Sequence, residues 1–161
     1  MATYTSTVRW SRKSEERFLD GRYSRAHEWE FDGGARVLAS ASPQVVRPPF
    51  SDPADVDPEE ALVAALSSCH MLFFLDFAKR KGFVIDSYVD EATGTMGASP
   101  DGRISMTEVV LRPHIVFSAE KRPTAADSAA LHHAAHEACY IANSVRSEVR
   151  VEPVEEGLTA G

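Results

Sequence analysis

Cysteine is scarce in this chain of 161 residues, which contains only two. A small fold held together by several disulfides is therefore excluded, and a chain of this length can bury a core without them. Positive charge is also in short supply, because the formal net charge is −7 and the pI is near 5.3. A phosphate-binding surface needs clustered Lys and Arg, so we do not expect a nucleic-acid partner.

The sequence also shows no sign of a signal peptide or of internal repeats. The first ten residues, MATYTSTVRW, do not show the basic-then-apolar order of a signal peptide. We therefore expect a cytoplasmic protein whose cysteines are thiols or a working redox pair rather than a permanent crosslink. Internal repeats and low-complexity tracts are not evident, and we predict a single domain over residues 1–154. The polar residues 155–161 are predicted to be a frayed C-terminal tail.

One stretch, residues 57–82, predicts a long helix. Asp57, Pro58 and Glu60 form a capping box with proline at the first helical position. Three basic residues and then Gly82 mark the end. Between Glu60 and Asp76 there is no charged residue, so we expect a helix that is apolar nearly all round and buried by the rest of the fold. We expect no membrane span, because the apolar run is short and contains polar residues.

Strands are predicted on both sides of this helix. Residues 3–10 favour an opening strand, and residues 25–31 and 35–41 form a hairpin around Asp32-Gly33-Gly34. The proline-rich residues 43–57 read as a connector to the helix. Residues 83–96 and 103–118 are predicted to pair as antiparallel strands across the turn at residues 99–102, with Pro113 at an edge or bulge.

A second helix and a last strand complete the chain. Thr124 and Asp127 predict another capping box, and an apolar stripe follows at helical spacing, with Cys139 on the same side; its members are Leu131, Ala135, Ala138 and Ala142. Residues 144–152 alternate, with valines inward and charged residues outward. The order of elements predicts an α+β fold, with an antiparallel sheet wrapped around a long central helix.

The two cysteines allow two interpretations. Cys69 and Cys139 are each expected on the buried side of a helix, where a cysteine often serves as a small core residue. If the two helices cross at these positions, the same residues form a redox pair, in which a sulfenic acid at one condenses with the thiol of the other. The residues alone do not select between these interpretations.

The helix start has a distinctive motif, in which Asp57-Pro58-Glu59-Glu60-Ala61-Leu62 is followed by Ser68-Cys69-His70, with a second cysteine late in the next helix. This arrangement resembles the OsmC/Ohr family of cytoplasmic thiol peroxidases. The ten-residue spacing from Glu59 to Cys69 matches the family motif. The resemblance implies an OsmC-like fold, an intertwined homodimer, and reduction of organic hydroperoxides in protection against oxidative stress.

The resemblance also implies a role for each residue of the site. Cys69 would be the peroxidatic thiolate and Cys139 the resolving thiol. Arg25 would favour the thiolate by its charge, and Glu59 would orient that arginine. Three other arginines are alternatives to Arg25, namely Arg12, Arg17 and Arg22. The residues after Cys139, Tyr-Ile-Ala-Asn, depart from the Cys-Pro-x-Ser pattern common in the family.

No cofactor is implied, and the expected reductant is an external dithiol, such as a lipoyl group. Met71, Phe73 and Phe74 are apolar neighbours of Cys69 and suit an alkyl or lipid hydroperoxide. Ten residues of continuous helix place Glu59 about 15 Å from Cys69, further than one arginine readily bridges. We therefore expect either a broken helix or a site completed by a partner chain.

Rival functions remain open. His132, His136 and Cys139 have the spacing of one helix face and suggest a zinc-binding module. His70 is next to Cys69, but neighbours on a helix point about 100° apart, so it is a poor general base for that thiol. A stress-linked interaction domain and a cysteine-dependent hydrolase are the further alternatives.

Overall fold

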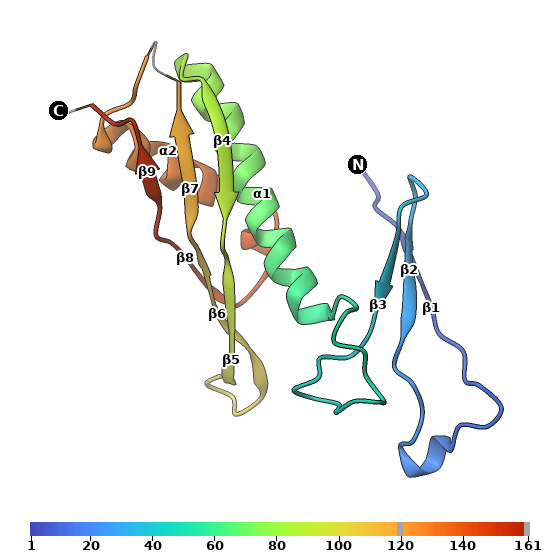
Figure 1. The fold of residues 1–161 in the computed structure, drawn as a ribbon. Coiled ribbons are helices and arrows are strands. Elements are labelled where there is room, and N and C mark those ends of the chain that lie inside the picture. Colours follow the sequence, from blue (N-terminus) through green and yellow to red (C-terminus); the bar gives the residue numbers. More distant parts are fainter. Residues whose placement is uncertain (119–120, 160–161) are drawn as a thin grey trace. The chain divides into compact units, whose positions relative to one another are not determined.

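The computed structural model describes residues 1–118 and 121–159 and divides the chain into two compact units. The N-terminal unit comprises residues 1–61 and the C-terminal unit residues 62–161. Figure 1 labels their helices and strands. Two α-helices and three three-stranded sheets are present in the described residues, so the predicted α+β class is confirmed. The single sheet that we expected is wrong, because the strands form three separate sheets.

The N-terminal unit contains an antiparallel sheet in the order β1-β2-β3. Its strands are β1 (Ser6–Arg9), β2 (His27–Phe31) and β3 (Arg36–Ala39), and a short 3-10 helix, η1 (Phe18–Asp20), lies in the loop before β2. The predicted hairpin between β2 and β3 is confirmed, and Gly34 has a φ of 84° in its turn. Turns occupy much of the proline-rich connector that follows.

The long helix α1 (Pro58–Lys81) begins and ends where the sequence predicts. The Glu60 amide donates to Asp57 (2.8 Å), and the Asp57 amide donates to Glu60 (3.1 Å), which completes the capping box. At the other end Gly82 has a φ of 76°, and the Phe83 amide donates to the Ala78 carbonyl. The helix is thus continuous, and the broken-helix alternative is wrong.

Only one stripe of α1 is buried in the single chain, at four residues spaced i, i+4: Leu66, His70, Phe74 and Ala78. Leu72, which points away from this stripe, is 63% exposed. The expectation of a helix buried all round is therefore wrong for one chain. By length and composition α1 is also apolar enough to cross a membrane, a test that core helices of soluble proteins pass as well.

The C-terminal unit contains two further sheets and α2 (Ala125–Ala138). One sheet has the order β4-β7-β9 and the other β5-β6-β8. Their strands are β4 (Ile85–Asp90), β5 (Thr93–Ala98), β6 (Ile104–Leu111), β7 (Pro113–Phe117), β8 (Glu148–Val151) and β9 (Val154–Glu156). The long strands predicted over residues 83–96 and 103–118 are each interrupted, so that β4 pairs with β7 and β5 with β6, both antiparallel.

The last two strands pair in parallel, which corrects the prediction of a wholly antiparallel sheet. β8 runs parallel to β6, and β9 runs parallel to β7. The reason is that α2 and the short helix η2 (Ala142–Ser144) carry the chain across before it pairs again. The tail also differs from the predicted fraying, because residues 154–156 form β9 and the Thr159 amide donates to the Pro123 carbonyl. Residues 160 and 161 lie outside the described residues.

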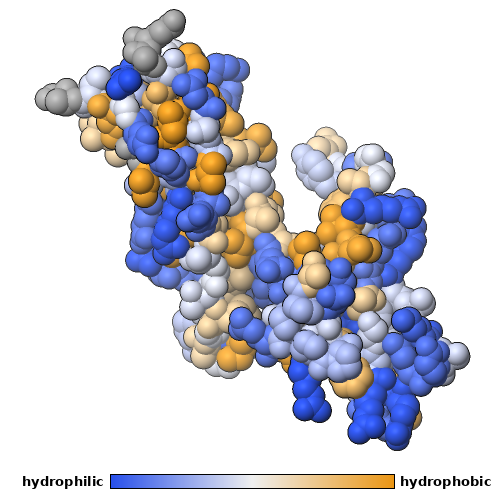
Figure 2. All heavy atoms as spheres, in the orientation of Figure 1, coloured by the Kyte–Doolittle hydropathy of each residue, from blue (hydrophilic) through white to orange (hydrophobic). Residues whose placement is uncertain are grey.

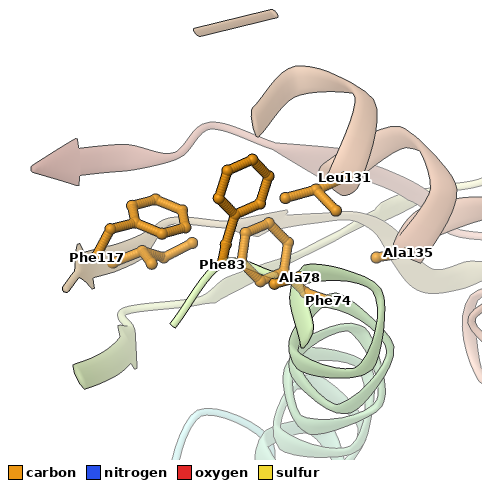
Figure 3. Packing of buried hydrophobic residues seen from close by; sticks show 7 residues of the cluster. Phe74, Ala78, Phe83, Phe117, Leu131 and Ala135 are labelled. Atoms are coloured by element: carbon orange, nitrogen blue, oxygen red, sulfur yellow. The ribbon is translucent and has the colours of Figure 1, made fainter. Parts of the chain in front are cut away.

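Two apolar clusters hold the C-terminal unit together. The larger one joins α1, α2 and the β4-β7 sheet, and Figure 3 shows its side chains meeting between the helices and the strands; its buried members are Phe74, Ala78, Phe83, Ile115, Phe117, Leu131 and Ala135. The smaller one packs Leu66 of α1 on Val109 and Leu111 of β6. One helix therefore supplies residues to both clusters.

Asp90 connects α1 to the residue that separates β6 from β7. Its carboxylate accepts a hydrogen bond from the Ser67 hydroxyl on α1 (2.5 Å) and one from the amide of Arg112 (2.6 Å). Arg112 is the residue between β6 and β7, and Pro113, which has no amide hydrogen to donate, opens β7. The prediction of an edge or a bulge at Pro113 is wrong, because Pro113 is the first residue of the central strand β7 and follows a break between two strands.

Replacing Phe74 by alanine tests the larger cluster. Phe74 is fully buried, so Phe74→Ala is expected to lower the free energy of unfolding by about 3–5 kcal/mol. Ile104→Ala is the control, because Ile104 is 73% exposed and its truncation should change stability by less than about 0.5 kcal/mol. Urea denaturation at fixed protein concentration measures both, and equal losses would contradict this assignment of the core.

Candidate functional site

The two cysteines meet inside the C-terminal unit. Cys69 lies near the middle of α1, and Cys139 is the C-terminal cap of α2. Both are free thiols; Cys139 is completely buried, whereas Cys69 is partly exposed. The Cys69 side chain lies close enough to Cys139 to raise the pKa of the Cys139 thiol. The structure therefore brings the two thiols close together, and the redox-pair interpretation stays a prediction.

The two sulfur atoms differ in their surroundings. Burial raises the pKa of Cys139 to about 11, and the neighbouring Cys69 side chain raises it as well. The backbone amide of Ala142 donates to Cys139 Sγ at 3.4 Å. Cys139 thus stays protonated at neutral pH, while Cys69 is the sulfur that solvent can reach.

The end of α2 explains the burial of Cys139. The Cys139 amide donates to the His136 carbonyl, and its own carbonyl accepts from the Asn143 amide. The helix therefore stops at this residue, and Ala142, which we expected on the helical stripe, lies in η2. The buried stripe of α2 consists of Ser128, Leu131, His132 and Ala135, and it leads to Cys139.

Aromatic side chains border the thiols. Tyr140, the residue after Cys139, packs edge-on against Phe73 of α1 with ring centroids 5.1 Å apart. Tyr140 is 71% exposed and Phe73, one helical turn after Cys69, is partly buried, so both rings reach solvent. Phe74 does not join them, because it is fully buried in the larger cluster. The expectation that Phe74 lines a substrate site is therefore wrong.

Two buried histidines form a second contact between the helices. His70 Nε2 and His132 Nδ1 are 3.1 Å apart, and their rings are nearly parallel with centroids 5.4 Å apart. The sequence did not predict this pair, although the core-facing spacing of His132 and Cys139 on α2 was a signal for it. Burial, with smaller contributions from His132 and His136, lowers the pKa of His70 to about 4.

The zinc site considered as a rival hypothesis is not found in the described residues. Within residues 1–118 and 121–159, no group of three His, Cys, Asp or Glu side chains is arranged to hold a metal ion. His132 faces the core and His136 is only partly buried. The three predicted ligands therefore do not act together, and the zinc-binding hypothesis loses its basis.

Arg25 and Glu59 both lie in the N-terminal unit. The Arg25 guanidinium donates to the carbonyl oxygens of Gly21 (2.7 Å) and Tyr23 (2.5 Å) and stacks 3.7 Å from the centre of the Tyr23 ring. Glu59 occupies the first turn of α1. Among the ion pairs of the described residues, none joins Arg25 to Glu59. Their roles at the thiols stay predictions.

Comparisons with known proteins agree on one family. Residues 51–154 match the family model described as OsmC-like protein. A solved structure of an OsmC-like protein of unknown function from Vibrio cholerae is 53% identical over 96% of this chain and 100% of that chain, with a TM-score of 0.94. No curated protein matches the chain.

More distant structures share the fold alone. An organic hydroperoxide resistance protein from Elizabethkingia anophelis is 17% identical, covers 96% of each chain and has a TM-score of 0.65. The organic hydroperoxide resistance protein OhrB of Bacillus subtilis is also 17% identical over 96% of this chain and 98% of its own, with a TM-score of 0.59.

Acid is expected to destabilise the fold through His70. The ordinary histidine pKa is near 6.5, so between about pH 6.5 and 4 the unfolded chain binds a proton that the folded chain does not. Stability should fall in this window by up to about 1.4 kcal/mol per pH unit. Urea unfolding at pH 7 and pH 5 measures the slope. His70→Gln should flatten it, whereas the exposed His133→Gln should not; an unchanged slope in His70→Gln would reject this origin.

Proposed function

The chain belongs to the OsmC-like protein family, and on that premise we propose that it is a thiol-dependent peroxidase that reduces organic hydroperoxides to alcohols. The observation that carries this proposal is the contact between the Cys69 and Cys139 thiols. Two structures that share the fold are named as organic hydroperoxide resistance proteins, which supports the same activity. The proposal places the protein in the reducing cytoplasm, where dithiols are available.

The proposed cycle has three steps. The Cys69 thiolate attacks one oxygen of the peroxide, the O–O bond breaks, and the alcohol leaves with a proton while Cys69 becomes a sulfenic acid. The Cys139 thiol then attacks the oxidised sulfur, which forms a disulfide and releases water. An external dithiol, such as a lipoyl group, finally reduces the disulfide by thiol exchange and is itself oxidised to a disulfide.

The apolar surroundings of Cys69 favour an organic substrate. Phe73 and Tyr140 expose ring surface beside the thiol, and Met71 is partly buried on the same helix. An alkyl or aryl group buried there gains roughly 25 cal/mol for each Å² of apolar surface removed from water. Hydrogen peroxide has no such group. We therefore expect the preference for organic hydroperoxides to depend on these side chains.

A partner chain would complete the site. Because α1 is continuous, Glu59 stays about 15 Å from Cys69 along the helix axis, and one arginine does not readily bridge them. We propose a homodimer whose sites lie at the interface, with a guanidinium from Arg25 or a neighbouring arginine beside Cys69 and Glu59 orienting it. The exposed apolar face of α1, which carries Leu72, is the surface that a second copy would cover.

Substitution of each cysteine by serine tests the proposed peroxidase activity. Cys69→Ser should abolish turnover of cumene hydroperoxide, a loss of more than 10³-fold, because serine cannot form the sulfenic acid. Cys139→Ser should consume one equivalent of peroxide and retain a sulfenic acid that dimedone labels. Circular dichroism checks that both variants fold, and lipoyl dithiol is compared with thioredoxin as reductant. If the parent protein instead hydrolyses esters without an added thiol, and Cys69→Ser loses that activity, the peroxidase hypothesis is rejected in favour of the cysteine-dependent hydrolase.

Light scattering after size exclusion tests the homodimer. The parent chain is expected at twice the monomer mass of 17.6 kDa. Leu72→Glu should shift the protein towards the monomer and lower peroxide turnover together, because it buries a charge at the interface. Val84→Glu is a control, since Val84 is 55% exposed and lies outside α1. A monomeric parent that is fully active would contradict the shared site.

A further inference from the structure

Three side-chain contacts fasten α2 and the residue after its cap to α1. The imidazoles of His70 and His132 meet at 3.1 Å, the Cys69 side chain is a near neighbour of the Cys139 thiol, and Phe73 packs on Tyr140. On α1 the histidine and the cysteine are consecutive. On α2 they are seven residues, or two helical turns, apart. On α1, the histidine contact is therefore nearer to Cys69 than the contact made by Phe73, which lies four residues after Cys69.

The histidine contact is buried and narrowly defined. His70 is 1% exposed and His132 is 6% exposed, and the Phe74 ring lies 4.3 Å from the His132 ring. A polar group without its hydrogen bond in such a place costs free energy, so the two rings must keep their separation as the side chains around them move. A shift of α2 along α1 would break this contact, whereas apolar neighbours tolerate small displacements.

The protons of the pair can be assigned. Within the described residues, His70 Nδ1 has no hydrogen-bond partner. A buried N–H without an acceptor is rarer and costlier than a bare nitrogen lone pair. The tautomer that leaves Nδ1 bare carries its proton on Nε2, so His70 Nε2–H donates to His132 Nδ1. Residue 132 therefore needs an acceptor at the Nδ1 position.

We infer that His70 and His132 are positioning residues for the thiol pair, because their hydrogen bond fixes α2 on α1 at the separation where Cys139 meets Cys69. The two histidines contact neither the substrate nor the oxidised sulfur. Their effect is on the probability that the two sulfurs are close enough to bond. The inference depends on the proposed function in one respect only, which is that the Cys69–Cys139 disulfide forms as a step of the peroxidase reaction.

The pair has to stay neutral for this role. A proton on His132 Nδ1 would set two donors against each other and break the hydrogen bond. Titratable groups near the pair in the described residues include His136 on α2, Cys69 on α1, and Tyr88 on β4, which packs against Phe74. Burial raises the pKa of Tyr88, with a smaller contribution from Asp90.

Equilibration with glutathione tests the inference without any peroxide. The two thiols react with one glutathione disulfide to give the Cys69–Cys139 disulfide and two molecules of glutathione, and mass spectrometry of alkylated protein measures the equilibrium constant. His132→Leu removes the acceptor, and the constant for disulfide formation should fall at least about tenfold, or about 30 mV. His132→Asn places an amide oxygen near the Nδ1 position, and the constant should return to within about threefold of the parent value.

Two controls separate positioning from stability. Leu131→Ala removes apolar contacts of the same helix and should lower the melting temperature while leaving the constant unchanged. His133→Leu changes an exposed histidine beside the pair and should alter neither. An unchanged constant in His132→Leu, or an equal fall in Leu131→Ala, would overturn the inference, as would a parent protein that forms no disulfide.

Two further outcomes are decisive. If His132→Leu does not fold, His132→Asn is compared with His132→Gln, whose oxygen lies nearer the Nε2 position; the constant should fall only in the glutamine variant, and equal constants would overturn the inference. A parent that forms the disulfide with glutathione but does not turn over hydroperoxides would overturn the proposed function and leave the role of the histidines standing.

Discussion

The buried stripe of α1 is the constraint on which the C-terminal unit depends. Leu66 belongs to one apolar cluster, and Phe74 and Ala78 belong to the other. His70 lies between them and is the only polar residue of the stripe. Cys69 is its neighbour in the chain, so its position follows from the same packing. A helix that packs both sheets through one line of residues leaves its remaining apolar surface, including Leu72, for another molecule to cover. In Figure 2 the visible face of the C-terminal unit mixes apolar and polar side chains.

The candidate site combines a partly exposed cysteine with a buried one. Cys69 is open enough for a substrate to approach, whereas Cys139 is enclosed, protonated and held by the end of α2. This difference suits two separate roles, in which Cys69 reacts with the oxidant and Cys139 then reacts with the oxidised Cys69. The aromatic rings of Phe73 and Tyr140 then act as an apolar border to the reactive sulfur.

Local signals in the sequence predicted the starts of both helices and the end of α1. The capping boxes at Asp57 and Thr124 and the glycine at residue 82 act within a few residues, so they appear directly in the sequence. The parallel pairing of β8 with β6 joins residues far apart in the chain, and periodicity carries no information about the direction of pairing. The contact between His70 and His132 was missed for the same reason. The family motif, rather than any periodicity, pointed to Cys69 and Cys139 as a pair.

The parallel crossover between β6 and β8 has a consequence for biosynthesis. Cys139 lies on the connection, after β7 and α2 and before the chain returns to pair with β6. During synthesis Cys69 emerges long before the residues that bring Cys139 beside it, and non-local pairing of this kind forms late. In an incomplete chain the two sulfurs therefore stay apart. Only a fully folded molecule holds them close enough for an oxidant to join them in a disulfide.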